Sequence, residues 1–90
     1  MSAYQLTVYG RVQGVGFRWS TLRLATEMKM AGTVKNLLDG SVQIVIEGPE
    51  EKIAVFIEKL EHNLTPFAKV SSIDKQPIPN QNLTDFQIID

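Results

Sequence analysis

Along this 90-residue chain the spacing of apolar residues changes its period several times. No other feature of the sequence restricts the possible folds as strongly. From Tyr4 to Val12 apolar and polar residues alternate, with Leu6, Val8 and Val12 on one face, which predicts a half-buried strand. From about Phe17 to Ala31 the period becomes helical. One helix face is formed by Thr21, Leu24, Ala25 and Met28. We expect Gly32 to end this helix, because glycine favours that position.

Two further strand patterns follow the first helix. Thr33 to Leu38 and Ser41 to Glu47 both read as strands, and the Asp39-Gly40 pair between them predicts a hairpin. In the second run, Val42, Ile44 and Ile46 share one face. Gly48-Pro49 then opens a second helix. Its buried face is predicted to consist of Ile53, Phe56, Ile57, Leu60 and Leu64.

The C-terminal part of the chain completes the order β-α-β-β-α-β. Residues 67–75 form a weaker strand pattern, which Pro77 and Pro79 are expected to break. Phe86, Ile88 and Ile89 predict a short final strand. This order predicts one α+β domain over residues 1–90, a ferredoxin-like split β-α-β sandwich. Its antiparallel sheet would have four strands plus the short C-terminal one, with two helices on one face.

Composition excludes several kinds of site. The chain has no cysteine, which excludes disulfides and thiolate nucleophiles, and its one histidine, His62, cannot build a zinc site or a Ser-His-Asp triad. Nine Lys and Arg against ten Asp and Glu give a formal charge of −1, whereas a duplex nucleic-acid binder normally has a basic surplus. No signal peptide or membrane-spanning stretch is recognisable. We therefore expect a cytoplasmic protein without nucleic-acid or membrane partners.

The segment between the first strand and the first helix has the features of an anion site. It contains Gln13, Gly14, Val15, Gly16, Phe17 and Arg18. The glycines let backbone N–H groups approach a ligand, and the helix N-terminus adds further unpaired N–H groups. Arg18 provides a planar fork of donors suited to phosphate oxygens. Trp19 could line the mouth of such a pocket, although its large apolar surface favours ordinary packing.

Asn36 is a second candidate residue. Alternation places it on the apolar face with Val34 and Leu38, where an amide without partners costs on the order of 1–3 kcal/mol. It could bond the backbone near the Asp39-Gly40 turn. Alternatively, it could face the anion pocket, because this fold brings the first loop close to the far end of the second strand.

Two runs of residues resemble the signatures of the acylphosphatase family. Gly10-Arg-Val-Gln-Gly-Val-Gly-Phe-Arg18 resembles the first, whose core is Gly-x-Val-Gln-Gly-Val-x-Phe-Arg. Gly32-Thr-Val-Lys-Asn36, continued to Gly48-Pro49, resembles the second, and the likeness reaches Asp85-Phe86-Gln87-Ile88. Thr33 departs from the pattern, because the family usually has an aromatic residue there.

The resemblance implies hydrolysis of the carboxyl–phosphate bond of small acyl phosphates. Arg18 would bind the phosphoryl group, Asn36 would orient the attacking water, and the backbone of residues 13–17 would complete the cradle. We expect a monomer that needs no metal or other cofactor, because a carboxylate leaving group departs without such help. Two alternatives remain open at this point: a non-catalytic ferredoxin-like module that binds phosphate or another ligand, and a carbamoyl-phosphate-handling accessory domain.

Overall fold

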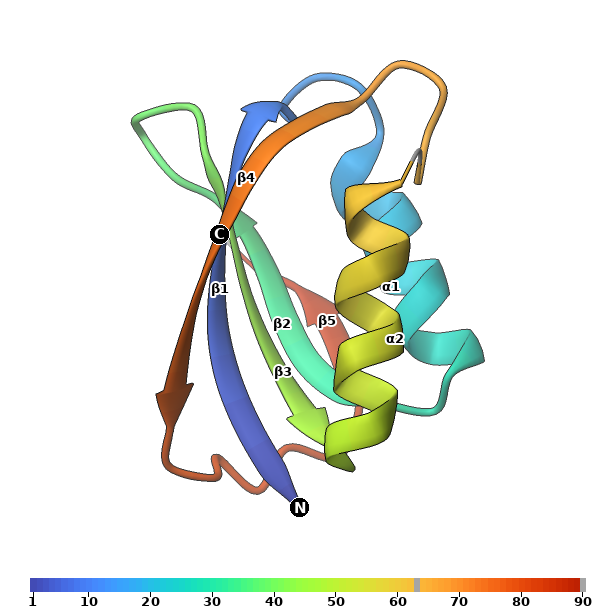
Figure 1. Ribbon diagram of the computed structural model, residues 1–90, viewed down its shortest axis with the longest axis vertical. Helices are drawn as coiled ribbons and strands as arrows, with labels where there is room; N and C mark the ends of the chain where they lie inside the picture. The colour runs from blue at the N-terminus through green and yellow to red at the C-terminus, as the bar shows by residue number, and fades with distance from the viewer. Residues whose placement is uncertain (63, 90) are drawn as a thin grey trace.

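The computed structural model describes residues 1–62 and 64–89 and places two helices on one face of a five-stranded sheet (Figure 1). The elements follow in the order β1 (Ser2–Arg11), α1 (Phe17–Glu27), β2 (Ala31–Asn36), β3 (Val42–Gly48), α2 (Glu50–Glu61), β4 (Lys69–Ile78) and β5 (Phe86–Ile88). The predicted ferredoxin-like order of elements and the single helical layer are confirmed.

The sheet has the strand order β4-β1-β3-β2-β5. In this order β1, β3 and β2 each run antiparallel to the strand before them, as expected. The short last strand is also present, but β5 runs parallel to β2, so the sheet is mixed rather than purely antiparallel. After β4 the chain passes below the sheet in Figure 1 and joins the free edge of β2. There the Gly32 N–H donates to the Asp85 carbonyl, and the Ile89 N–H donates to the Val34 carbonyl.

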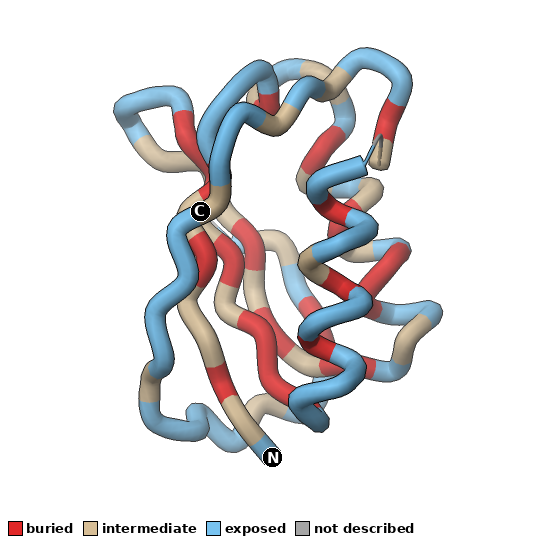
Figure 2. Tube along the Cα trace, in the orientation of Figure 1, coloured by how far each residue is buried: buried red, intermediate tan, exposed pale blue. Residues whose placement is uncertain are grey.

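The core lies between the sheet and the two helices (Figure 2). Leu6 and Val8 of β1 are fully buried, as predicted from their alternation. The same holds for the predicted face of β3, formed by Val42, Ile44 and Ile46. The helices bury the side chains of Phe17, Thr21, Leu24, Ala25, Ile53, Phe56 and Leu60. The two periodicities of the sequence therefore identify the inner faces of these elements.

The first helix ends earlier than predicted. It stops at Glu27, and the left-handed residue that turns the chain is Lys29, with φ of 57°, rather than Gly32. The Met30 N–H donates to the Ala25 carbonyl and the Lys29 N–H to the Thr26 carbonyl, which is the hydrogen-bond pattern of a Schellman cap. The prediction that Gly32 ends the helix is wrong.

The fourth strand begins and ends later than predicted. Residues 65–68 form a turn in which the Thr65 hydroxyl accepts the N–H groups of Phe67 and Ala68. The strand then continues through Pro77 instead of breaking before it. Because β4 pairs only with β1, it is an edge strand, and an edge strand tolerates a residue without an N–H group.

Gly32 lies inside β2 at a place where a side chain cannot fit. A methyl group there would overlap the carbonyl oxygen of Val45 and lie 2.9 Å from the Phe86 ring. We predict that Gly32→Ala lowers the free energy of unfolding by about 1–3 kcal/mol, because β3 or β5 must move. Urea unfolding measures the change. The control is Thr33→Ala, on the opposite face of the strand, and a Gly32→Ala variant as stable as this control would contradict the prediction.

Candidate active site

The loop between β1 and α1 presents a row of unpaired backbone donors. Gly14 and Gly16 have positive φ angles of 75° and 80°, and a methyl group on either would meet nothing within 4 Å. Gly16 is the N-cap of α1 and provides no side-chain cap. Among the residues that the structure describes, none accepts a hydrogen bond from the N–H groups of residues 14–18. Five consecutive N–H groups at a helix N-terminus are suited to an anion.

Hydrogen bonds to two other loops hold this loop in place. The Gln13 amide donates to the carbonyl oxygens of Leu37 and Ser41, at 2.8 Å each. On the other side, the Thr65 hydroxyl donates to the Val15 carbonyl at 3.3 Å. The loop is therefore fastened both to the β2–β3 connection and to the α2–β4 connection. Sequence reasoning assigned only the backbone of Gln13 to the cradle and missed its side chain, because no periodicity marks a side-chain bond between two loops.

The β2–β3 connection is a compact turn, although longer than the predicted two-residue hairpin. Gly40 has a positive φ of 95°, and the Leu37 N–H donates to the Ser41 carbonyl at 2.8 Å. The Asp39 carboxylate accepts the Ser41 hydroxyl at 2.5 Å and the Ser41 N–H at 3.0 Å. These two bonds, the hydroxyl first, hold the pKa of Asp39 below its ordinary value. The ionised Asp39 therefore stabilises the turn whose carbonyl groups accept the hydrogen bonds of the Gln13 amide.

Asn36 is the last residue of β2 and lies beside this turn. It shares the helix-facing side of the strand with fully buried Val34, whereas Leu38 lies beyond the strand end and is exposed. The predicted shared face therefore holds for Val34 and fails for Leu38. The Oδ1 atom of Asn36 is buried and has no hydrogen-bond partner within the described part of the chain. The alternative in which Asn36 bonds the backbone near the Asp39-Gly40 turn therefore does not hold for its Oδ1.

Arg18 lies in the first turn of α1, half-buried, and lines a hollow between this helix and β5. The N-terminal end of α1, the loop and the C-terminal end of β2 all lie at the upper end of the molecule in Figure 1. In the sheet β3 lies between β1 and β2, and Gln13 connects the loop to the residue after Asn36. The structure thus brings the predicted loop and the two predicted side chains to one end of the fold.

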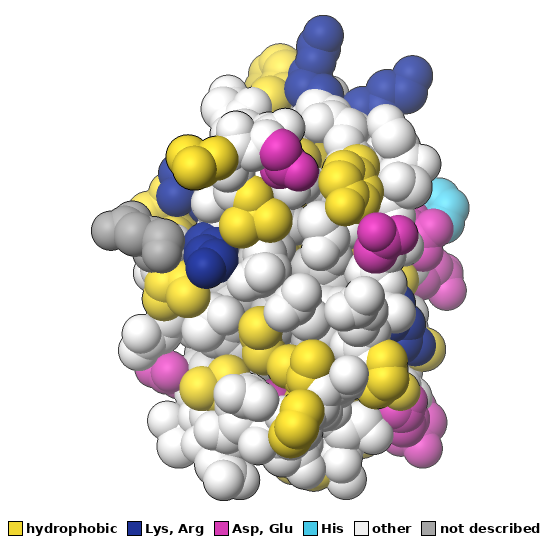
Figure 3. All heavy atoms as spheres, turned by 90° about the vertical axis from the view of Figure 1, so that its left-hand side faces the viewer, with side chains coloured by type: hydrophobic (Ala, Val, Ile, Leu, Met, Phe, Trp, Pro, Cys, Tyr) yellow, Lys and Arg dark blue, Asp and Glu magenta, His cyan; other side chains and the backbone are white. Residues whose placement is uncertain are grey.

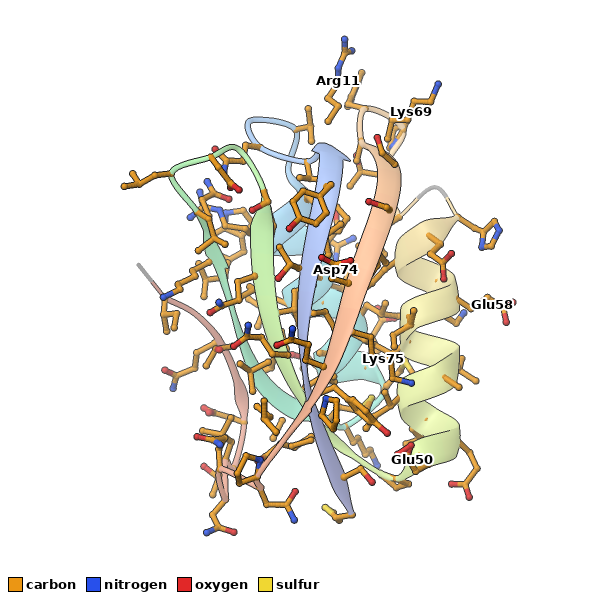
Figure 4. All side chains as sticks on the ribbon, turned by 60° about the vertical axis from the view of Figure 1, so that its left-hand side comes forward. Arg11, Glu50, Glu58, Lys69, Asp74 and Lys75 are labelled. Atoms are coloured by element: carbon orange, nitrogen blue, oxygen red, sulfur yellow. The ribbon has the colours of Figure 1, made fainter. Side chains whose placement is uncertain are left out.

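Two basic side chains, Arg11 and Lys69, lie at this end of the molecule, as does the Asp39 carboxylate of the β2–β3 turn. Figure 4 shows Arg11 and Lys69 pointing outward there, away from the labelled carboxylates Glu50, Glu58 and Asp74. The two residues are partners across β1 and β4. On the helix-free side of the sheet, Lys and Arg side chains protrude at the upper end, and apolar groups and an acidic side chain lie among and below them (Figure 3). Positive charge at the mouth of the site favours the approach of an anion.

Within residues 1–62 and 64–89, His, Asp and Glu side chains form no group of three that could hold a metal ion. None of the described helices is both long and apolar enough to cross a membrane.

The Gln13 side chain provides a test of how the loop is held. In Gln13→Glu, two carboxylate oxygens would face the carbonyl oxygens of Leu37 and Ser41 and repel them, whereas Gln13→Ala only removes the donor. We predict that Gln13→Glu weakens binding of inorganic phosphate more than Gln13→Ala does and lowers the free energy of unfolding by about 1–3 kcal/mol. Calorimetric titration and urea unfolding measure the two effects. Equal phosphate affinity in Gln13→Glu and the unmodified chain would contradict this role.

Comparisons with known proteins identify relatives of this chain in sequence and in structure. The family model described as Acylphosphatase matches residues 4–88. A curated acylphosphatase from Lactiplantibacillus plantarum is 43% identical over 88 residues, 98% of each chain. The crystal structure of an acylphosphatase from Bacillus subtilis matches all of both chains with a TM-score of 0.95 and 41% identity. HypF from T. kodakarensis matches with a TM-score of 0.89 and 43% identity over 12% of its length. The chain belongs to the acylphosphatase family.

Proposed function

We propose that this protein hydrolyses the carboxyl–phosphate bond of small acyl phosphates and releases a carboxylate and inorganic phosphate. One observation carries the proposal beyond family membership. A loop with five unpaired N–H groups is fastened by Gln13 to the strand end that carries the unpaired Oδ1 of Asn36. Donors for a phosphate and an acceptor for a water molecule are thus assembled at one place.

The phosphoryl group would bind in the loop. The backbone of residues 13–17 would surround its oxygens, and the Arg18 guanidinium would bind two of them at once. These donors would also stabilise the charge on the phosphoryl group as it is transferred. Phosphoryl transfer depends mostly on such positioning and charge stabilisation, so few other groups are required.

The leaving group explains why no acid is needed. Attack by the water oxygen forms a new P–O bond, the P–O bond to the carboxyl group breaks, and its electron pair leaves with the carboxylate. The conjugate acid has a pKa of about 4, so the carboxylate departs without being protonated. A site without histidine, cysteine or a carboxylate pair can therefore perform this reaction.

The water would be oriented by Asn36. Its Oδ1 can accept one O–H of the water, but an amide cannot remove a proton near neutral pH. We therefore assign the role of proton acceptor to an oxygen of the substrate's own phosphate, so that both protons of the water end on the phosphate product. Neither a metal ion nor another cofactor enters this reaction scheme.

The proposed reaction and the composition of the site also bear on the oligomeric state, the location and the partners of the protein. The loop, Arg18 and Asn36 come from one chain, so a second copy is not needed to complete the site, and we propose a monomer with a single domain over residues 1–90. A phosphorylated small molecule as substrate supports a cytoplasmic enzyme. The outer face of β3 presents Gln43 and Val45 instead of aromatic residues, and the formal charge is −1, which does not favour a nucleic-acid partner.

Arg18 is the first residue to test. We predict that Arg18→Ala lowers kcat/KM for benzoyl phosphate by roughly 10³- to 10⁵-fold, because a phosphate-clamping arginine can be worth that much. The matched control is Arg23→Ala, an exposed arginine of the same helix, which should retain normal turnover. Both are assayed with benzoyl, acetyl and carbamoyl phosphate in excess chelator.

The outcomes of this assay separate the proposals. Near-normal turnover in Arg18→Ala would overturn the role of Arg18, and loss of activity in chelator would overturn the metal-independent reaction. If the unmodified chain binds phosphate but hydrolyses none of the three substrates, it is a binding module. Turnover of carbamoyl phosphate alone would favour the accessory role.

Asn36 should affect turnover more than binding. We predict that Asn36→Ala lowers kcat by at least about 10²-fold, while the affinity for inorganic phosphate changes little, because the asparagine contacts the water instead of the phosphate. Urea unfolding provides a second readout. Since the variant removes a buried acceptor that has no partner, its free energy of unfolding should not fall. Weakened phosphate binding with an unchanged kcat would reverse the assigned role.

A further inference from the structure

The peptide unit between Val15 and Gly16 lies in the middle of the phosphate loop. Its carbonyl oxygen belongs to Val15 and accepts the Thr65 hydroxyl at 3.3 Å. Its N–H group belongs to Gly16, the N-cap residue of α1, and is one of the five that no described residue accepts. The unit is trans and planar, so its C=O and N–H bonds point in opposite directions. The group that holds the Val15 carbonyl therefore also sets the direction of the Gly16 N–H.

The loop itself does little to fix this peptide unit. Gly16 has a φ of 80° and no side chain that would restrict rotation. A methyl group on Gly16 would meet nothing within 4 Å, so neighbouring atoms do not confine it either. Apart from Thr65, no residue in the described part of the chain donates to the Val15 carbonyl. The orientation of this unit thus depends on one hydroxyl group from another loop.

The turn Thr65-Pro66-Phe67-Ala68 holds that hydroxyl in place. Proline favours the second position of such a turn, and the Ala68 N–H donates to the Thr65 carbonyl at 3.3 Å. The Thr65 hydroxyl oxygen accepts the N–H groups of Phe67 and Ala68 at 3.1 Å each. Both of its lone pairs are then used, and its proton is left for the Val15 carbonyl. Thr65 is only 6% exposed, so little water competes for this proton.

We propose that Thr65 is a positioning residue of the phosphate site: by holding the Val15 carbonyl on one side, it orients the Gly16 N–H toward a phosphoryl oxygen on the other. The inference rests on the proposed function. A phosphate that accepts the Gly16 N–H polarises the peptide unit and makes the Val15 carbonyl a stronger acceptor. The two hydrogen bonds therefore strengthen each other, although Thr65 does not contact the substrate. Gln13 has a different role, because it fixes the loop relative to Asn36.

The hydroxyl group can be removed with little change of shape. Thr65→Val replaces it with a methyl group, whereas Thr65→Ser retains it. We expect Thr65→Val to weaken binding of inorganic phosphate and to lower kcat/KM for benzoyl phosphate, each on the order of tenfold, because one donor to the phosphate is no longer oriented. Thr65→Ser should retain near-normal values of both. A Thr65→Ser variant as impaired as Thr65→Val would overturn the role of the hydroxyl.

Glu47 provides a matched control for a purely structural effect. It is buried near the end of β3, and its carboxylate accepts the backbone N–H groups of Gln81 and Leu83, as the Thr65 hydroxyl accepts two such groups. This end of β3 lies far from the phosphate loop (Figure 1). Thr65→Val and Glu47→Gln should both lower the free energy of unfolding, but only Thr65→Val should change phosphate affinity. Equal loss of phosphate affinity in the two variants would overturn the proposal.

Calorimetric titration measures the phosphate affinity, and the fluorescence of Trp19 gives a second signal. The large apolar surface of Trp19 favours packing in the core, but the side chain is 68% exposed, so that interpretation is wrong. It is the one tryptophan of the sequence and directly follows Arg18, so its fluorescence reports on the surroundings of this arginine.

The amide ¹H–¹⁵N spectrum needs no turnover, so it separates this proposal from the proposed function. The probe is inorganic phosphate at saturation. We expect the Gly16 amide proton to shift downfield in the unmodified chain and to shift less in Thr65→Val, while the Arg18 amide shifts equally in both. No Gly16 shift, or equal Gly16 shifts in the two proteins, would overturn the positioning role even if both hydrolyse benzoyl phosphate. A smaller Gly16 shift without any hydrolysis would support this role and remove the catalytic one.

Discussion

The two hydrogen bonds from the Gln13 amide to the carbonyls of Leu37 and Ser41 are the interaction on which the site depends. The glycine loop belongs to the β1–α1 connection and Asn36 to the end of β2, so without a link the two could move independently. Gln13 fixes their separation with a neutral donor that adds no charge next to a phosphate. Because both carbonyls belong to one turn, a single side chain positions the loop against the strand end.

The fold was largely predictable because its inner faces follow simple periods. Leu6 and Val8 of β1 are buried as expected, and so is most of the predicted apolar face of each helix. Met28 and Ile57 are only partly buried, and Leu64 lies beyond the end of α2. The errors concern positions at which tertiary contacts overrule local preference. Lys29 takes the left-handed conformation that glycine usually provides, and Pro77 is tolerated because β4 is an edge strand. β5 is parallel to β2 because the chain returns along the lower end of the sheet, where β2 also begins (Figure 1). None of these can be read from neighbouring residues alone.

The predicted site residues lie at one end of the fold, as expected, but the contacts that support them were not predictable. The loop, Arg18 and Asn36 follow from the glycines, the arginine and a polar residue on an apolar face. The Gln13 bonds, the Thr65 bond to Val15 and the exposed Trp19 depend on which loops meet at one end of the sheet. The unpaired Oδ1 of Asn36 is buried and therefore costly to the fold, which is expected where a protein keeps a polar group free for a ligand.

The central claim is that the loop holds the phosphate through its backbone. Its most direct test is the amide ¹H–¹⁵N spectrum of the unmodified protein during titration with inorganic phosphate. The account predicts saturable downfield shifts of the amide protons of residues 14–18, with a smaller change at the side-chain amide of Asn36. If these signals stay fixed while the amides at the N-terminus of α2 shift, the phosphate binds elsewhere and the assignment of the loop is wrong.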